Sequence, residues 1–218
     1  MGSISTSEPV DIDKMINGKL LSPASIGHWG MRTTPENFEK MVEWHTNFFG
    51  AEVIYRLPTV AFLRYDDEHH RLVILADPNH KPVENRTAAC GIYHIAFSLR
   101  SLTELAVSYE QKKARGILPH WPVNHGMSTS MYYFDPDKNE FEMQVDNFDT
   151  AEEAHAFMRT EEYGQNPIGV DFVPEDFVKR VRSGKETEEE LKKRPVIGKR
   201  HTRWENSLYF QEADKYKG

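Results

Sequence analysis

The chain has very little cysteine, with only Cys90 among its 218 residues. An internal disulfide is therefore excluded, and so low a cysteine content is typical of proteins from a reducing compartment such as the cytosol. The first residues also lack the basic flank and apolar core of a secretory signal. We accordingly expect a cytoplasmic protein.

Long apolar runs are missing as well, since no stretch approaches the roughly 20 apolar residues that a membrane-spanning helix needs. Positive charge is in the minority, because 27 Lys and Arg stand against 34 Asp and Glu and give a formal net charge of -7. This balance argues against nucleic acid or an anionic membrane as the main partner. An apolar content of 39% and a charged content of 28% are ordinary for a soluble globular chain.

An internal repeat of strand, helix and three strands organises most of the sequence. In the first copy, a strand-like run is followed by a helical pattern that ends at Gly50 and then by three strand-like runs. In the second copy, the run at 91–99 is followed by a helix between a capping Ser101 and Gly116, and then by three more strand candidates. The repeat predicts an α+β fold made of two βαβββ modules, at residues 23–80 and 88–149.

The segments outside these modules differ from them in composition. Residues 1–22 are polar, and we expect them to form an N-terminal tail. Residues 150–218 are rich in charge and predict a helical C-terminal extension that wraps the core or a partner subunit, which favours a homodimer or a higher homo-oligomer. The stretch ENSLYFQ at 205–211 resembles an engineered protease-recognition sequence with one extra serine, so we leave it out of the predicted fold.

Each module carries a histidine in its first strand, His28 and His94. The last strand of the second module adds Glu140 and Glu142 on one face, where an acidic side chain is costly unless it is paired or bound to a metal. A lone strand histidine can simply be a hydrogen-bonded structural residue, but equivalent positions in both repeats favour ligands. Two histidines and a carboxylate with open coordination positions suit non-haem Fe(II), and Mn(II) or Zn(II) are alternatives.

A pair of adjacent histidines, His69 and His70, precedes an apolar run. If residues 71–75 form a strand, alternation predicts that His70 shares a face with Leu72 and Ile74, whereas His69 points to the opposite face. Only one histidine of the pair can therefore face a given pocket.

Four stretches carry a resemblance to a known family: IGHWGMR, HHRLVIL, GIYHIAFSL and NHGMSTSMYYFDPDKNEFEMQVDN. They resemble the vicinal oxygen chelate superfamily, and within it the single-domain type I extradiol catechol dioxygenases. The stretch NPIGVDFVPEDFVKRVRSG resembles the C-terminal extension of single-domain relatives. The resemblance implies two βαβββ modules that form a pair of half-barrels around one metal. It further implies cleavage of a catechol-like ring with Fe(II) and O2.

The same resemblance implies a role for individual residues. His28, His94 and Glu142 correspond to the two-histidine, one-carboxylate metal triad of the family. His70 corresponds to the second histidine of the HH motif, which acts as the acid–base residue and would exchange a proton with the substrate. His69 is then expected to be a neighbour of the site rather than a ligand.

Two further residues match the family in the last stretch. Tyr132 corresponds to a tyrosine near the substrate hydroxyl, and His125, whose match is offset along the chain, corresponds to a histidine that interacts with bound oxygen. A glycine that the family often has in the turn after Asp137 is replaced by Lys138 here.

Alternative functions on the same scaffold stay open at this point. The position in the first module that corresponds by offset to Glu142 is Ala76, so a fourth ligand of the glyoxalase type is absent there and three ligands are favoured. A metal-dependent lyase, isomerase or glyoxalase-like enzyme is one alternative, and a non-catalytic aromatic-binding protein is another. The metal triad separates an enzyme from the binding protein, and His70 and Tyr132 favour the dioxygenase.

Overall fold

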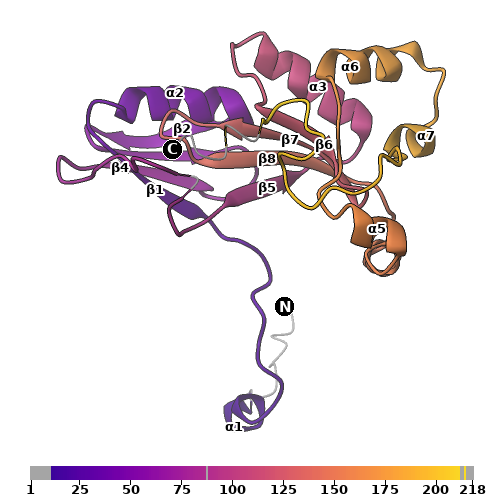
Figure 1. The fold of residues 1–218 in the computed structure, drawn as a ribbon. Coiled ribbons are helices and arrows are strands. Elements are labelled where there is room, and N and C mark those ends of the chain that lie inside the picture. Colours follow the sequence, from indigo (N-terminus) through magenta and orange to yellow (C-terminus); the bar gives the residue numbers. More distant parts are fainter. Residues whose placement is uncertain (1–10, 87, 212–213, 215–218) are drawn as a thin grey trace, which may run out of the picture.

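The computed structural model describes residues 11–86, 88–211 and 214, and Figure 1 shows its arrangement. The first βαβββ unit consists of β1 (Trp29–Thr33), α2 (Phe38–Phe49), β2 (Glu52–Leu57), β3 (Val60–Arg64) and β4 (Leu72–Ala76). The second consists of β5 (His94–Ser98), α3 (Leu102–Lys113), β6 (Trp121–Asn124), β7 (Ser128–Phe134) and β8 (Glu140–Asp146). The predicted α+β class and the repeated order of elements are confirmed.

The first module is a four-stranded sheet with the order β1-β4-β3-β2 and one helix on it. Helix α2 ends where predicted, at Gly50 in the left-handed conformation (φ 63°), which a glycine adopts without strain. Its apolar side chains Met41 and Val42 pack on Leu63 and Ile74 of the sheet. The sheet is therefore covered by α2 on one face.

The second module is a five-stranded sheet with the order β5-β8-β7-β6-β9, in which β9 is Val170–Asp171. Helix α3 begins at the predicted cap, because the Ser101 hydroxyl accepts a hydrogen bond from the Glu104 N–H over 3.1 Å. Leu105 of α3 and Phe141 of β8 lie in the same core cluster. Helices α2 and α3 lie on the same side of the two sheets (Figure 1).

A shared core joins the two modules on this helical side. Phe48 of α2 belongs to the same cluster as Tyr133 and Phe141 of the second module. Beside it, the ring Nε2 of His45 lies 3.3 Å from Asp135 Oδ2, and both side chains are completely buried. Close packing and a buried polar pair therefore hold the modules together along α2.

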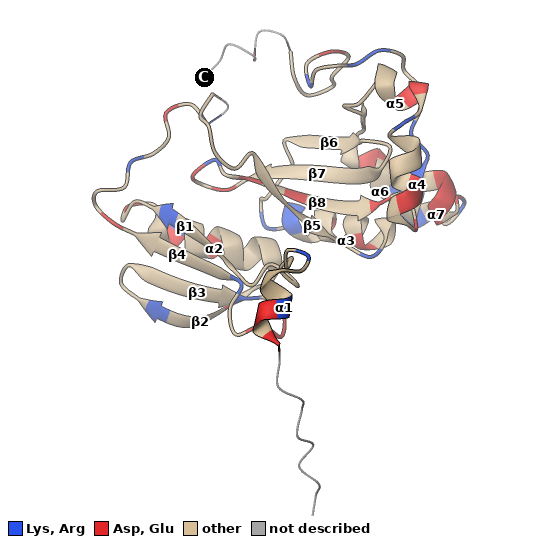
Figure 2. Ribbon diagram, turned by 90° about the horizontal axis from the view of Figure 1, so that it is seen from below, with Lys and Arg blue, Asp and Glu red and all other residues tan. Residues whose placement is uncertain are grey.

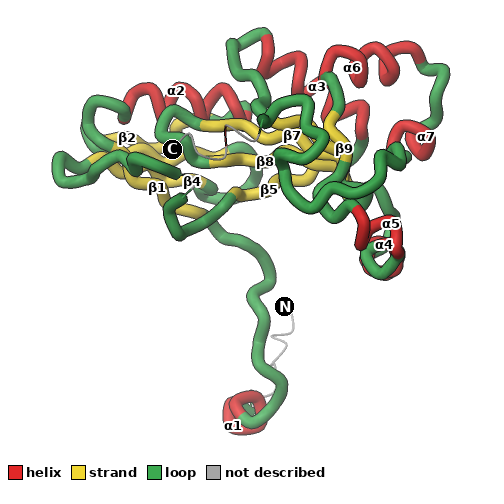
Figure 3. Tube along the Cα trace, viewed as in Figure 1, coloured by secondary structure: helices red, strands yellow, loops and turns green. Residues whose placement is uncertain are grey.

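The C-terminal extension lies against the second module (Figure 3). It contains α4 (Ala151–Phe157), α5 (Glu161–Gln165), α6 (Pro174–Ser183) and α7 (Glu188–Lys192) besides β9. Strand β9 pairs antiparallel with β6, and Phe177 and Val178 of α6 enter the core under α3. This extension extends the second sheet by one strand and thickens its helical layer.

The stretch at 205–211 also belongs to the fold, so its exclusion from the predicted fold was wrong. Ser207 donates a hydrogen bond to Asp171 over 2.6 Å, and the hydroxyl of Tyr209 donates to the Phe172 carbonyl over 2.7 Å. Phe210 and Trp121 contact each other, with ring centroids 5.6 Å apart. Likeness to a linker sequence does not prevent an aromatic segment from packing on an apolar surface.

The N-terminal tail predicted for residues 1–22 lies partly outside the described residues, which begin at residue 11. Its described part contains the short helix α1 (Ile12–Ile16), capped by Asp11. The segment from α1 to β1 runs away from the two sheets (Figure 1). In the described part of the chain, no helix has the length and apolar character needed to cross a membrane.

Candidate functional site

The first pair of site residues lies on neighbouring parallel strands of the second module. His94 is the first residue of β5, and Glu142 is opposite Ala96 in the register of β5 and β8. The ring Nε2 of His94 lies 3.1 Å from Glu142 Oε2. Glu142 lies on the sheet face opposite Phe141 and Met143, which are in the core under α3, as strand alternation predicts. The structure therefore brings two of the three predicted metal ligands into contact.

Two further predicted residues adjoin this pair. Tyr132 is opposite Glu142 in the register of β7 and β8, and its ring centroid is 5.3 Å from that of His94. Its hydroxyl lies 3.0 Å from His125 Nε2. Because His125 Nδ1 donates a hydrogen bond to the Ile168 carbonyl, Nε2 is left to accept one from the Tyr132 hydroxyl. His94, Glu142, Tyr132 and His125 thus form one cluster, which we call the β5–β8 cluster.

Burial and hydrogen bonds set the protonation of this cluster. Burial raises the pKa of Glu142, but hydrogen bonds from His94 and Ser130 outweigh it, so that the pKa is lowered overall. The hydrogen bond to Glu142 raises the pKa of His94. Burial, reinforced by the charge of Glu142, raises the pKa of Tyr132, whereas burial lowers the pKa of His125. A neutral phenol and a neutral imidazole therefore face a carboxylate.

The remaining predicted residues lie together in the first module. His28 immediately precedes β1, and its ring centroid is 4.4 Å from that of His70. The ring of His69 is also 4.4 Å from that of His70, and the side chain of His69 is 74% exposed. His28 and His70 thus form a second group, which we call the histidine pair. As expected, His69 lies beside this group and points to solvent.

The prediction that His70 shares a face of the sheet with Leu72 and Ile74 was wrong. Strand β4 begins at Leu72, and Leu72 and Ile74 are buried under α2. The ring centroid of His70 instead lies 5.2 Å from that of Phe62. The residues on either side of Phe62 in β3 are buried under α2, so Phe62 itself faces the uncovered side of the sheet. Alternation applies only within a regular strand, and His70 comes before the strand begins.

These positions decide whether the three predicted ligands could hold one metal ion. Among residues 11–86, 88–211 and 214, no three His, Cys, Asp or Glu side chains converge closely enough to hold a metal. His94 and Glu142 supply two adjacent donors, while His28 lies with His70 in the other module. The complete predicted triad therefore does not fit one ion within a single chain.

The structure also separates the two glutamates of β8, which strand alternation alone left equivalent. Glu140 Oε1 lies 2.9 Å from His120 Nε2 and 3.7 Å from Arg203, whose guanidinium also donates to the Tyr93 hydroxyl. Because His120 and Arg203 already lie against Glu140, Glu142 is the carboxylate left for a ligand. The roles of His120 and Arg203 were missed because their partners are distant in sequence and the pattern of the sequence does not connect them.

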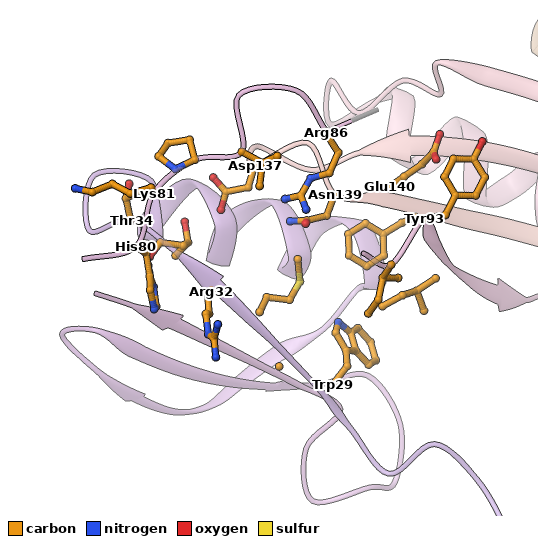
Figure 4. A pocket seen from close by; sticks show the side chains of 18 of the residues that line it. Trp29, Arg32, Thr34, His80, Lys81, Arg86, Tyr93, Asp137, Asn139 and Glu140 are labelled. Atoms are coloured by element: carbon orange, nitrogen blue, oxygen red, sulfur yellow. The ribbon is translucent and has the colours of Figure 1, made fainter. Parts of the chain in front are cut away.

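A cavity of about 730 Å³ lies between the two modules. Figure 4 shows Trp29 and Arg32 along β1 on one side of it, and Asn139 and Glu140 on the side of the second module. Arg86, from the segment that connects the modules, also lines it. The lining comes from both modules and from the segment 79–86 that connects them, and it includes neither the His94–Glu142 pair nor the histidine pair. Strands β1 and β5 are nevertheless in contact, since the ring centroids of Trp29 and Phe97 are 5.2 Å apart.

Comparisons with known proteins identify a family and two relatives that the sequence matches. Residues 26–143 match the model of the Glyoxalase/Bleomycin resistance protein/Dioxygenase superfamily. The chain is 43% identical over 137 residues to Biphenyl-2,3-diol 1,2-dioxygenase 2 of Rhodococcus globerulus, which covers 63% of this chain and 72% of that protein. It is 37% identical over 159 residues to Biphenyl-2,3-diol 1,2-dioxygenase 3 of the same organism, covering 73% of this chain and 83% of that protein.

Among solved structures, the fold is similar to a glyoxylase/bleomycin resistance protein/dioxygenase domain from Frankia sp. EAN1pec. The TM-score is 0.49 at 16% sequence identity, and the match covers 62% of this chain and 99% of that one.

Proposed function

This chain belongs to the Glyoxalase/Bleomycin resistance protein/Dioxygenase superfamily, and we propose that it is an extradiol-type dioxygenase that opens the ring of a catechol-like aromatic with O2. The observation that carries the proposal is the β5–β8 cluster, in which two donors for a metal lie beside a neutral tyrosine and a neutral histidine. The two relatives that are named as dioxygenases support the same reaction type. A small aromatic compound is accordingly the proposed partner, in a reducing, cytosolic setting that fits the single cysteine.

We propose Fe(II) as the metal, with Mn(II) or Zn(II) as alternatives, because a two-histidine, one-carboxylate donor set with open positions suits non-haem iron. His94 and Glu142 are the two adjacent donors in this chain that would hold it. When bound, such a metal supplies electron transfer to O2 and a charge that favours ionised substrate oxygens.

Proton control falls to the side chains around this metal position. Tyr132 is a hydrogen-bond donor, because its raised pKa keeps the phenol protonated, and we propose that it turns from His125 to a substrate oxygen. His125, whose pKa is lowered by burial, is a neutral acceptor on the same side. His70 is assigned the exchange of the substrate proton, for which an imidazole suits neutral pH.

Reconstitution with Fe(II) under anaerobic conditions tests this function. The loaded protein is mixed with a panel of catechols that includes biphenyl-2,3-diol, and O2 uptake is recorded together with the absorbance of a yellow ring-cleavage product. We expect uptake with at least one catechol, and we expect none from the same protein before iron is added.

The outcome also separates the alternatives. An iron-loaded protein that consumes no O2 with any catechol would contradict the dioxygenase proposal. Turnover without O2 uptake would instead favour a lyase, an isomerase or a glyoxalase-like reaction, and tight binding of catechols without metal or turnover would favour an aromatic-binding protein.

A further inference from the structure

We infer that the cavity between the two modules binds a small, flat acid, an aromatic or conjugated compound that carries one carboxylate. This site is separate from the β5–β8 cluster and from the histidine pair, because the cavity is lined by neither. It therefore adds a second binding function to the proposed reaction, and it depends neither on that reaction nor on a metal.

The walls of the cavity are tied together by hydrogen bonds. His80 Nδ1 donates to the Thr33 carbonyl over 3.0 Å, which holds the segment after β4 on the end of β1. Asn37, at the start of α2, donates to Asp137 Oδ1 over 2.5 Å and so joins the first module to the β7–β8 turn. The enclosed volume of about 730 Å³ lies within the range of roughly 300–1,000 Å³ that is typical of small-molecule sites.

One part of the cavity lining is apolar and rigid. Its apolar side chains include Trp29, Met31, Ile95 and Phe141. The ring centroid of Trp29 is 5.6 Å from that of Phe49 and 5.2 Å from that of Phe97, so side chains of both modules hold the indole in place. A flat ring or a conjugated chain packs well against a surface of this kind.

Buried polar atoms without a hydrogen-bond partner among the described residues lie in the same lining. They include three donors, Trp29 Nε1, Thr33 Oγ1 and Arg86 Nε, and one acceptor, Asp137 Oδ2. Thr33 is only 3% exposed. Because buried polar groups are normally hydrogen-bonded, these atoms mark where the polar groups of a ligand would bind.

The charge of the lining favours an acid. Arg32, Lys81 and Arg86 line the cavity, and within the described part of the chain none of them makes an ion pair. Of the two acids in the lining, Glu140 already lies against a histidine and an arginine, which leaves Asp137 to oppose three cations. A concave site with such an excess of positive charge attracts anions.

The basic positions come from two elements that meet at the cavity. Figure 2 shows them at β1 and along the segment that leads from β4 to β5. The acidic residues of that segment, Asp77 and Glu84, do not line the cavity. The segment therefore turns its positive rather than its negative side chains to this space.

Arg86 is the residue that we assign to the carboxylate. Figure 4 shows its side chain reaching into the space between the modules, and it is half-buried, whereas Arg32 and Lys81 are exposed. A guanidinium presents a fork of donors that matches both oxygens of a carboxylate. The oxygen of Asp137 that has no partner disfavours a second negative group, so a monoacid suits the site better than a diacid.

Calorimetric titration of the metal-free, full-length protein tests the inference. Benzoate is the aromatic acid, and benzamide is the neutral compound of the same shape. We expect one benzoate to bind per chain, and we expect benzamide to bind about tenfold more weakly or less, because it lacks the charge that pairs with a guanidinium.

Sorbate, an open-chain conjugated acid, separates two sources of the same chemistry. Affinity equal to that of benzoate would point to an open-chain acid, such as the product of a ring opening, as the ligand. Weaker binding of sorbate would point to an acid with an intact ring.

Substitutions in the lining locate the binding site. Arg86→Gln should weaken benzoate binding about tenfold or more, and Arg86→Lys should weaken it less, because the ammonium keeps the charge but loses the fork. Trp29→Phe keeps an aromatic ring and removes the indole N–H, so a loss of about threefold is expected. Benzoate should raise the melting temperature of the wild type and have little effect on that of Arg86→Gln.

Two controls match these variants. Arg100→Gln makes the same chemical change at a side chain that is 92% exposed and does not line the cavity, and it should bind benzoate like the wild type. His94→Ala alters the β5–β8 cluster and should also leave benzoate binding unchanged. Far-UV circular dichroism shows whether each variant is folded.

Three results would overturn the inference. They are no binding of benzoate to the wild type, equal binding of benzoate and benzamide, and a loss in His94→Ala as large as that in Arg86→Gln, which would place the acid at the β5–β8 cluster. Since the titrations use neither iron nor O2, a failure of the dioxygenase proposal would leave their outcome unchanged, and the reverse also holds.

Discussion

The adjacent histidines His69 and His70 have different surroundings, although they are neighbours in the sequence. The ring of His70 contacts those of His28 and Phe62, whereas the side chain of His69 is 74% exposed. Burial and the neighbouring histidines His28 and His69 lower the pKa of His70, so it is a neutral imidazole at neutral pH. Residue identity alone does not assign a role here, because the role depends on which rings surround the side chain.

The first prediction distinguishes a proton carrier from a metal ligand. His70→Ala should retain bound iron and lose most turnover, about a hundredfold or more, because general acid–base catalysis contributes on that order. Glu142→Ala should lose the iron itself. Iron content and the turnover of the best catechol are measured for both variants, with His69→Ala as the control that changes neither. Loss of iron from His70→Ala would instead make His70 a ligand.

At the scale of elements, β9 is held in place by a buried ion pair. Arg200 and Asp171 are 2.7 Å apart with side-chain exposures of 0% and 1%, and Asp171 also accepts hydrogen bonds from Trp121 and Ser207. One carboxylate thus connects β6, β9 and the segment near the C-terminus. It explains how a charged extension with few apolar residues stays against the second module.

The second prediction follows from this connection. Asp171→Asn should lower the free energy of unfolding by about 3 kcal/mol, because it leaves the guanidinium of Arg200 buried without its counter-charge. Urea unfolding followed by far-UV circular dichroism measures the loss. Asp176→Asn, at an exposed position of α6, is the control. An equal loss of unfolding free energy in both variants would mean that the buried ion pair contributes no more than an exposed carboxylate.

Helices α3 and α6 are joined by a pH-sensitive contact. The Tyr109 hydroxyl donates to Glu175 over 2.5 Å, and Lys113 donates to it over 2.7 Å. Hydrogen bonds from Lys113 and Tyr109 lower the pKa of Glu175 to about 2. The folded pKa therefore lies below the ordinary value of 4.5, and the stabilisation is present above pH 4.5 and lost as the pH falls towards 2.

The third prediction uses that pH dependence. Glu175→Gln should destabilise the protein at pH 7 by only about 0.5 kcal/mol, because the carboxylate is half exposed and screened by solvent. The difference from wild type should shrink as the pH falls from 4.5 towards 2. Melting temperatures across this range measure it, with Glu189→Gln on α7 as the control. A difference that grows in acid would have the wrong sign and would reject the contact as its source.

The whole molecule depends on the junction between its two modules. Phe48, Tyr133 and Phe141 form part of one core across it, and the His45–Asp135 pair lies at its margin. Asp135 also accepts hydrogen bonds from Asn139, so it ties the β7–β8 turn to α2. This junction therefore sets how the first module is oriented against the second.

The fourth prediction concerns this junction. His45→Ala should lower the free energy of unfolding by roughly 3 kcal/mol, because it opens a cavity and removes a partner of a buried carboxylate. Urea unfolding followed by tryptophan fluorescence and by circular dichroism measures it. His155→Ala on exposed α4 should change the free energy by less than about 0.5 kcal/mol, and equal losses in the two variants would contradict a structural role for His45.

Much of the fold was predictable from the sequence because its signals are local. The glycine that ends α2, the capping Ser101 and the alternation in β8 each act within a few residues, although α3 ends at Lys113, before the predicted Gly116. The resemblance assigned Tyr132 and Glu142 to one site, and in the strand register the two residues are opposite each other. The face of His70 could not, since the regular strand begins only after it.

The sequence by itself therefore determined the two βαβββ modules, the residue types of a metal site and the absence of any internal disulfide. Only the tertiary structure decided which of these residues meet. It paired His94 with Glu142, occupied Glu140 with His120, and left His28 with His70 on the other module. The physical reason is that periodicity acts along a single element, whereas the distance between elements depends on how the packing at α2 orients one module against the other.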